Sequence, residues 1–127
     1  LKNGIFEGLS FLKKEGYNVI IVSSSDPLII NKHLNYYFLN EYISDVVSAK
    51  EVTRGKPYPD IYLYLSKKFN IKPEEILVVE DSPNGILSAK FAGCKTIMIP
   101  DLSEPDNALL NKIDVVLPDF SYIKNVF

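Results

Sequence analysis

Short apolar runs alternate with amphipathic segments of helical length along the chain. The runs fit β-strands, and the predicted strands are residues 18–22, 45–49, 76–79, 96–99 and 115–117. The predicted helices are residues 6–15, 27–39, 59–70 and 83–93, with a helical turn at 72–75 and a short helix at 121–126. Strands that alternate with single helices predict βαβ units, a parallel sheet and right-handed crossovers. We therefore expect an α/β fold of Rossmann-like type, an open parallel sheet with helices on both faces.

Local start and stop signals place the helix ends. Asp26-Pro27 and Ser82-Pro83 each put a capping side chain before a proline, which is typical of a helix start. The second of these helices is predicted to stop at Gly93, because glycine is typical of a helix C-terminus.

Length and charge exclude several classes of protein. The 127 residues fit one domain. A net charge of −2 gives no reason to expect a nucleic-acid or membrane partner, and no apolar run approaches the ~18 residues that span a bilayer. The single Cys94 cannot form a disulfide within the chain, so we expect a cytoplasmic protein.

Ligands of open α/β sheets bind beyond the carboxyl ends of the strands, and serines follow the first predicted strand. Ser23 supplies a hydroxyl and Ser24 a backbone amide just before a helix N-terminus, which favours phosphate. The alternative is that these serines only cap the turn.

Charged residues come at the same edge from two other segments. Glu80 and Asp81 follow an apolar strand and supply hard oxygen ligands suited to Mg²⁺, or else simply favour the dipole of the next helix. Lys56 is followed by a proline-bounded segment that stiffens its backbone, and its ammonium could neutralise phosphate or order a carboxylate. The alternative is an ordinary solvated lysine at the surface.

The remaining polar candidates are expected to be structural. His33 is predicted at the surface, Asp60 at a helix start, and Cys94 as a buried, inert thiol. No P-loop, no dinucleotide-binding glycine motif and no paired Cys/His spacing is present in the sequence.

Three segments in order resemble the haloacid dehalogenase superfamily, in particular its phosphatase and β-phosphoglucomutase-like members. Residues 19–25, an apolar strand ending in serine, resemble the second motif of the family. Residues 55–60, Gly-Lys-Pro-Tyr-Pro-Asp, resemble the third motif, and residues 78–86, with an acidic pair followed by Ser-x-x-Gly, resemble the fourth.

The resemblance implies phosphoryl transfer through a phosphoaspartyl intermediate with Mg²⁺, acting on a small phosphorylated metabolite such as a sugar phosphate. Ser23 and the Ser24 amide would hold phosphate oxygens, and Lys56 would balance the charge of nucleophile and phosphoryl group. Asp81 would bind Mg²⁺ beside Glu80. The acidic pair favours phosphate chemistry over dehalogenation.

The sequence departs from the family pattern at its first motif. No Asp-x-Asp pair is present, so the nucleophile, the general acid/base and one metal ligand are missing, as is the substrate-selecting cap. The strand that carries this motif should lie between the strands ending at Ser23 and Glu80. We therefore expect residues 1–127 to be a partial core domain with its first strand missing, inactive alone. An N-terminal segment or a second copy would complete the sheet.

Two other readings remain open. The chain could be a catalytically dead module of the same fold that binds phosphate or metal, which the absent Asp-x-Asp favours. It could also be an unrelated flavodoxin-like or receiver-like domain, although a receiver needs an acidic cluster near its N-terminus, and residues 1–16 hold only Glu7 and Glu15.

Overall fold

The computed structural model describes residues 4–100 and 113–127. The chain divides into two compact units, which are described in turn. Unit 1 consists of Leu1–Glu51 with Asp119–Phe127, and unit 2 consists of Val52–Pro118. The sequence expectation of one partial core domain stays a prediction.

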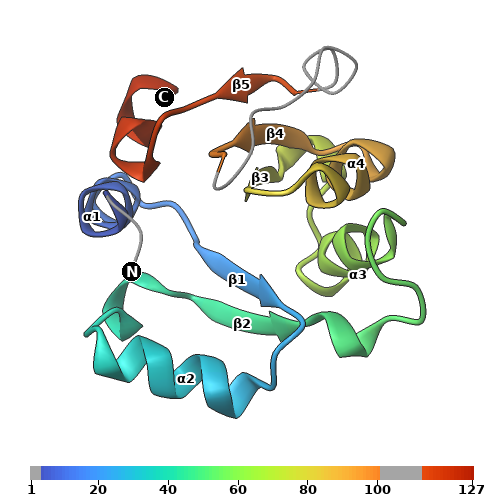
Figure 1. Ribbon diagram of the computed structural model, residues 1–127, viewed down its shortest axis with the longest axis horizontal. Helices are drawn as coiled ribbons and strands as arrows, with labels where there is room; N and C mark the ends of the chain where they lie inside the picture. The colour runs from blue at the N-terminus through green and yellow to red at the C-terminus, as the bar shows by residue number, and fades with distance from the viewer. Residues whose placement is uncertain (1–3, 101–112) are drawn as a thin grey trace. The chain divides into compact units, whose positions relative to one another are not determined.

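Unit 1 is built on two parallel strands, β1 (Ile20–Ser23) and β2 (Asp45–Ser48), in a register that pairs Ser23 with Ser48. The helix α2 (Pro27–Tyr36) lies alongside β2 (Figure 1). The other elements of unit 1 are α1 (Ile5–Lys14), α2 (Pro27–Tyr36) and the 3₁₀ turns η1 (Asn40–Tyr42), η2 (Ala49–Glu51) and η4 (Phe120–Asn125).

The core of unit 1 forms where its helices meet. Leu9 of α1, Leu34 of α2 and Leu39 are buried together. α1 also packs on η4, so closely that a β-carbon at Gly8 would lie 2.1 Å from the ring of Phe120. A residue without a β-carbon is therefore required at position 8.

Among the described residues, unit 2 contains three parallel strands, β3 (Leu77–Glu80), β4 (Lys95–Met98) and β5 (Val115–Val116), in the order β3-β4-β5, which leaves β3 at an edge. The helix α4 (Pro83–Ala92) packs on β3 and β4 and contacts α3 (Asp60–Lys68). Ile86 of α4 and Met98 of β4 are buried in a cluster with Leu87 and Ile113. The elements are α3 (Asp60–Lys68), η3 (Pro73–Glu75), β3 (Leu77–Glu80), α4 (Pro83–Ala92), β4 (Lys95–Met98) and β5 (Val115–Val116).

The helix starts agree with the capping signals. Asp26 accepts a hydrogen bond from the Leu28 N–H at 2.8 Å, and Ser82 accepts one from the Gly85 N–H at 3.1 Å. Gly93 adopts a left-handed φ of 93° after α4, as its position predicted.

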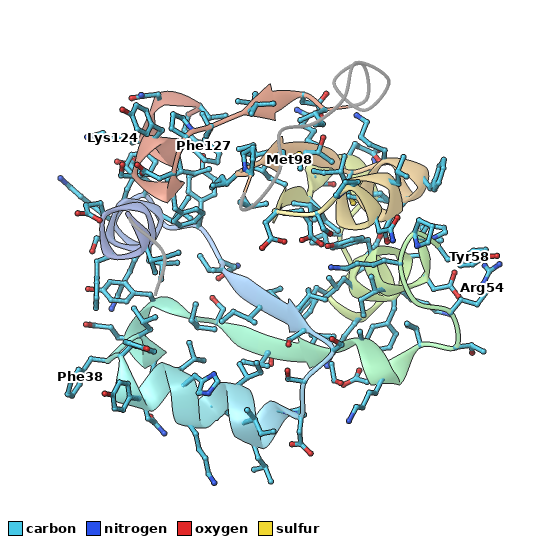
Figure 2. The ribbon with its side chains drawn as sticks, viewed as in Figure 1. Phe38, Arg54, Tyr58, Met98, Lys124 and Phe127 are labelled. Atoms are coloured by element: carbon cyan, nitrogen blue, oxygen red, sulfur yellow. The ribbon has the colours of Figure 1, made fainter. Side chains whose placement is uncertain are left out.

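One helix ends earlier than the sequence predicted. The helix expected over residues 27–39 stops at Tyr36, because Phe38 adopts a φ of 58° and the Leu39 N–H donates back to the Leu34 carbonyl. This is a Schellman ending, with phenylalanine where glycine is usual. The side chain of Phe38 points away from α2 into solvent (Figure 2).

The parallel α/β class is confirmed by this arrangement and by its similarity to solved structures given below. In the described residues the strands form two sheets rather than one: β1 pairs with β2 in unit 1, and β3, β4 and β5 pair in unit 2. The strands agree with the predicted runs to within one or two residues. In the described ranges no helix has the length and apolar character needed to span a bilayer.

Candidate functional site

Lys56 and Glu80 form an ion pair in unit 2, although 24 positions separate them in the sequence. Glu80 is the last residue of β3, and its side chain is only 12% exposed, while that of Lys56 is 32% exposed. The Lys56 ammonium donates to Glu80 Oε2. The pair therefore stands at the carboxyl end of a parallel strand, where the sequence predicted charged residues.

The second oxygen of Glu80 is also engaged. Glu80 Oε1 accepts a hydrogen bond from the Asp81 N–H at 3.1 Å. The carboxylate lies against α4 at Gly85, where a β-carbon would be 1.7 Å from Glu80 Oε2. Glu80 is thus held by charge, by a backbone donor and by close packing, while the Asp81 side chain beside it is exposed.

The loop that carries Lys56 is fixed by its neighbours. Arg54 donates to both carboxylate oxygens of Asp60, at 3.0 and 2.8 Å, and its guanidinium lies 4.4 Å from the ring centroid of Tyr58 (Figure 2). The hydrogen bond from Arg54 holds the pKa of Asp60 below its ordinary value. On the other side of the loop, the buried Ser88 hydroxyl donates to the Tyr58 carbonyl at 2.6 Å.

The serine turn lies in unit 1. Ser23 ends β1, and its Oγ accepts a hydrogen bond from the Ser25 N–H at 3.1 Å. Ser24 is exposed, and Asp26 caps α2 directly afterwards. The turn therefore joins a strand end to a helix N-terminus, the setting that favours an anion.

Burial perturbs two further side chains of unit 2. Burial raises the pKa of the Tyr62 hydroxyl, and the charge of Glu80 adds to the effect. Burial also raises the pKa of the Cys94 thiol to about 11. Cys94 is 2% exposed, so the predicted burial of its thiol is confirmed, and its inertness stays a prediction.

The donors for a divalent cation are limited. Across residues 4–100 and 113–127 no three His, Cys, Asp or Glu side chains come together as a metal site. Glu80 and Asp81 offer hard carboxylate oxygens, and Mg²⁺ needs few protein ligands because it keeps several waters. The residues present fit one side of a magnesium site.

The structure brings some of the predicted site residues together. Lys56 contacts Glu80, and Asp81 follows Glu80 in the chain. Ser23 and Ser24 belong to the other unit, so their approach to Lys56 stays a prediction, as do the roles of all five residues. His33 is exposed and Asp60 begins α3, as expected.

Sequence reasoning did not predict what supports the site. Gly85 stood in the Ser-x-x-Gly motif without an assigned role, and the structure shows that it makes room for Glu80. Arg54, Tyr58 and Ser88 hold the loop that carries Lys56. Gly85 and Ser88 are three residues apart on α4 and therefore share a face, a spacing that could have drawn attention to them.

Parallel strands flanked by helices, with Glu80 at the carboxyl end of β3, place the chain among α/β proteins. The chain belongs to the haloacid dehalogenase-like hydrolase family, whose family model matches residues 1–99. The curated relatives include hexitol phosphatase A of Escherichia coli, which is 36% identical over 116 residues, or 91% of this chain and 52% of the relative. The phosphorylated carbohydrates phosphatase of Thermotoga maritima is 33% identical over 94 residues, or 74% of this chain and 44% of the relative.

Solved structures extend the comparison. A haloacid dehalogenase family hydrolase from Deinococcus radiodurans, solved with bound phosphate and sodium, superposes with a TM-score of 0.81 at 27% identity. The match covers 98% of this chain and 58% of that protein. Similar structures also include proteins assigned as β-phosphoglucomutases. The chain spans about half the length of the two curated relatives described above.

Proposed function

We propose that this chain supplies the phosphate-neutralising and magnesium-binding part of a phosphate-monoester hydrolase core. The observation that carries the proposal is the Lys56–Glu80 ion pair at the carboxyl end of β3, beside Asp81. It joins the third and fourth motifs of the family at one point of unit 2, as phosphoryl transfer by such a core requires. Bound phosphate in the related Deinococcus radiodurans structure supports a phosphate ligand.

In the proposed reaction an aspartate carboxylate attacks phosphorus, and the bond from phosphorus to the leaving oxygen breaks as a general acid protonates that oxygen. Water then attacks phosphorus and gives a proton to the same group, now the general base, which releases inorganic phosphate and regenerates the carboxylate. The nucleophile and the general acid/base are both groups of the missing first motif. Lys56 would neutralise charge on the phosphoryl oxygens, and Ser23 with the Ser24 amide would hold two of them. Asp81 and Glu80 would hold Mg²⁺, which supplies further charge neutralisation when bound.

The nucleophile has to come from outside this sequence, which contains no Asp-x-Asp pair. In the proposed arrangement the missing strand, from an N-terminal segment or a second copy, pairs with the open edge of β3. Residues 1–127 alone would then bind ligand without turnover. The substrate we propose is a small phosphorylated metabolite such as a sugar phosphate, because two relatives are named hexitol phosphatase and phosphorylated carbohydrates phosphatase. The proposed location is the cytoplasm.

Two alternatives use the same residues. A phosphomutase would pass the phosphoryl group to a substrate hydroxyl instead of water, as the β-phosphoglucomutase assignments of similar structures suggest. A dead binding module is favoured by the absent Asp-x-Asp pair.

The test is hydrolysis of p-nitrophenyl phosphate, with and without Mg²⁺, by the 127-residue chain and by a longer form that includes the sequence encoded upstream of Leu1. We expect Mg²⁺-dependent turnover in the longer form only. In that form Lys56→Ala and Asp81→Asn should each lower kcat by about 10²–10³-fold, because each removes preorganised charge stabilisation. Lys67→Ala, at an exposed position on α3, is the control. Full activity of Lys56→Ala would overturn the proposal, and inactivity of both forms would favour the binding module.

A further inference from the structure

One face of the helix α4 contacts Glu80 of the Lys56–Glu80 pair and also the loop that carries Lys56, at Tyr58. Gly85 and Ser88 are three residues apart and both are buried. Residues at this spacing lie one above the other on a helix surface. Gly85 lies against the Glu80 carboxylate, and Ser88 lies against the loop that carries Lys56.

Gly85 gives the Glu80 carboxylate its place. A β-carbon at residue 85 would lie 1.7 Å from Glu80 Oε2, 2.0 Å from its carboxyl carbon and 2.5 Å from Cγ. No side chain fits at these distances unless Glu80 moves. The missing β-carbon therefore sets how close the carboxylate lies to the first turn of α4.

Ser88 holds the loop that carries Lys56. Its hydroxyl donates to the Tyr58 carbonyl at 2.6 Å, and the Ser88 side chain is fully buried. The Tyr58 N–H in turn donates to the Gly55 carbonyl at 3.0 Å, which closes a turn around Lys56 and Pro57. The buried Ser88 hydroxyl would be costly to leave without an acceptor, so this bond ties the turn to α4.

We propose that Gly85 and Ser88 are positioning residues, which make one face of α4 the template that sets the Lys56–Glu80 geometry. The proposal deepens the proposed function and rests on it, because a fixed ammonium is useful only if it meets a charged ligand. Without the space at Gly85 the carboxylate shifts, and without the Ser88 hydroxyl the lysine turn loosens. In both cases Lys56 leaves its place on Glu80.

The test is NMR of the 127-residue chain labelled with ¹³C at lysine Cε, which reports the environment of the Lys56 ammonium without any enzymatic turnover. Loss of one signal in Lys56→Arg assigns the resonance. Glu80→Gln gives the position of that resonance when the carboxylate is neutralised. Gly85→Ala and Ser88→Ala are then compared with two matched controls.

The controls make the same chemical changes away from the template. Ser66→Ala also removes a helix serine whose hydroxyl donates to a backbone carbonyl, that of Ile71. Gly55→Ala adds a β-carbon next to Lys56 itself, but into open space. If general destabilisation were the cause, the controls would move the Lys56 signal as well.

We expect Ser88→Ala and Gly85→Ala to move the Lys56 signal most of the way to its position in Glu80→Gln, while Ser66→Ala and Gly55→Ala leave it at the wild-type position. A folded Ser88→Ala chain with a wild-type Lys56 signal overturns the proposal, and so does an equal shift in Ser66→Ala. Should Gly85→Ala fail to fold, Ser88→Ala decides alone, because alanine is well tolerated in a helix. If the longer form has no phosphatase activity but Ser88→Ala and Gly85→Ala still shift the Lys56 signal, the proposed function is rejected and the positioning role of α4 is retained.

Discussion

The two units carry their candidate site residues in contrasting states. In unit 1 the Ser23 hydroxyl bonds within its own turn, and Ser24 is exposed. In unit 2 Lys56 and Glu80 neutralise one another, and the loop of Lys56 is tied down by the Arg54–Asp60 pair. A phosphate group that met unit 1 would find a turn open to solvent, whereas one that met Lys56 would have to compete with Glu80. The comparison shows that the positive charge of Lys56 is paired with Glu80 within the chain, whereas the serine turn is not paired with any charged group among the described residues.

The largest expected effect is a loss of stability in the core of unit 2, where α4 is packed. Ile86 is fully buried, so Ile86→Ala should lower the free energy of unfolding by about 2–5 kcal/mol through lost burial and a residual cavity. Urea denaturation monitored by circular dichroism measures the change. Ile71→Ala, at a position that is 37% exposed, is the control and should cost much less. Equal losses would show that unit 2 is not packed as described.

The next effect tests the open turn of unit 1. Ser23→Ala should weaken binding of inorganic phosphate to the 127-residue chain by about tenfold, because a hydroxyl donor to a charged ligand is lost. Ser24→Ala keeps the backbone amide and should change the affinity little. Calorimetric titration of both variants compares them. The same loss in both would remove the distinction between hydroxyl and amide donors.

The smallest effect concerns a pair that joins α4 to β4 and β5. Partial burial raises the pKa of Asp114. Hydrogen bonds from the Thr96 N–H, at 2.8 Å, and from the Lys90 ammonium, at 3.2 Å, lower the pKa by more than burial raises it, so the pKa lies below its ordinary value. A carboxylate with a lowered pKa stabilises the fold above its ordinary pKa, and this stabilisation is lost as the pH falls through the pKa of the folded state.

Asp114→Asn should therefore cost up to about 1 kcal/mol at pH 7, since the side chain is 46% exposed and solvent screens the pair. The cost should shrink toward zero as the pH falls well below the ordinary aspartate pKa. Urea unfolding of wild type and variant across this range measures it. A difference that stays constant with pH would mean that the carboxylate charge contributes nothing.

Local signals in the sequence predicted most of the fold. Asp26, Ser82 and Gly93 act through bonds or backbone angles within a few residues of themselves, so they can be recognised without knowing the tertiary structure. The early end of α2 could not be recognised in this way. Phe38 takes a left-handed conformation that its residue type does not favour.

In the candidate site, too, the sequence predicted the residues but not the tertiary contacts between them. Motif order predicted that Lys56, Glu80 and Asp81 lie at one site, but it did not predict that Lys56 contacts Glu80. That contact spans 24 positions and depends on where α4 places Gly85. Only the tertiary structure reveals which side chain a glycine makes room for.

The division of the chain has a consequence for how it is assembled. Unit 2 is one continuous stretch, Val52–Pro118, whereas unit 1 combines Leu1–Glu51 with Asp119–Phe127 across it. During synthesis the contacts within residues 52–118 can form before η4 emerges, but α1 must wait for η4. We expect residues 52–118 of the nascent chain to become resistant to protease before the residues of unit 1 do.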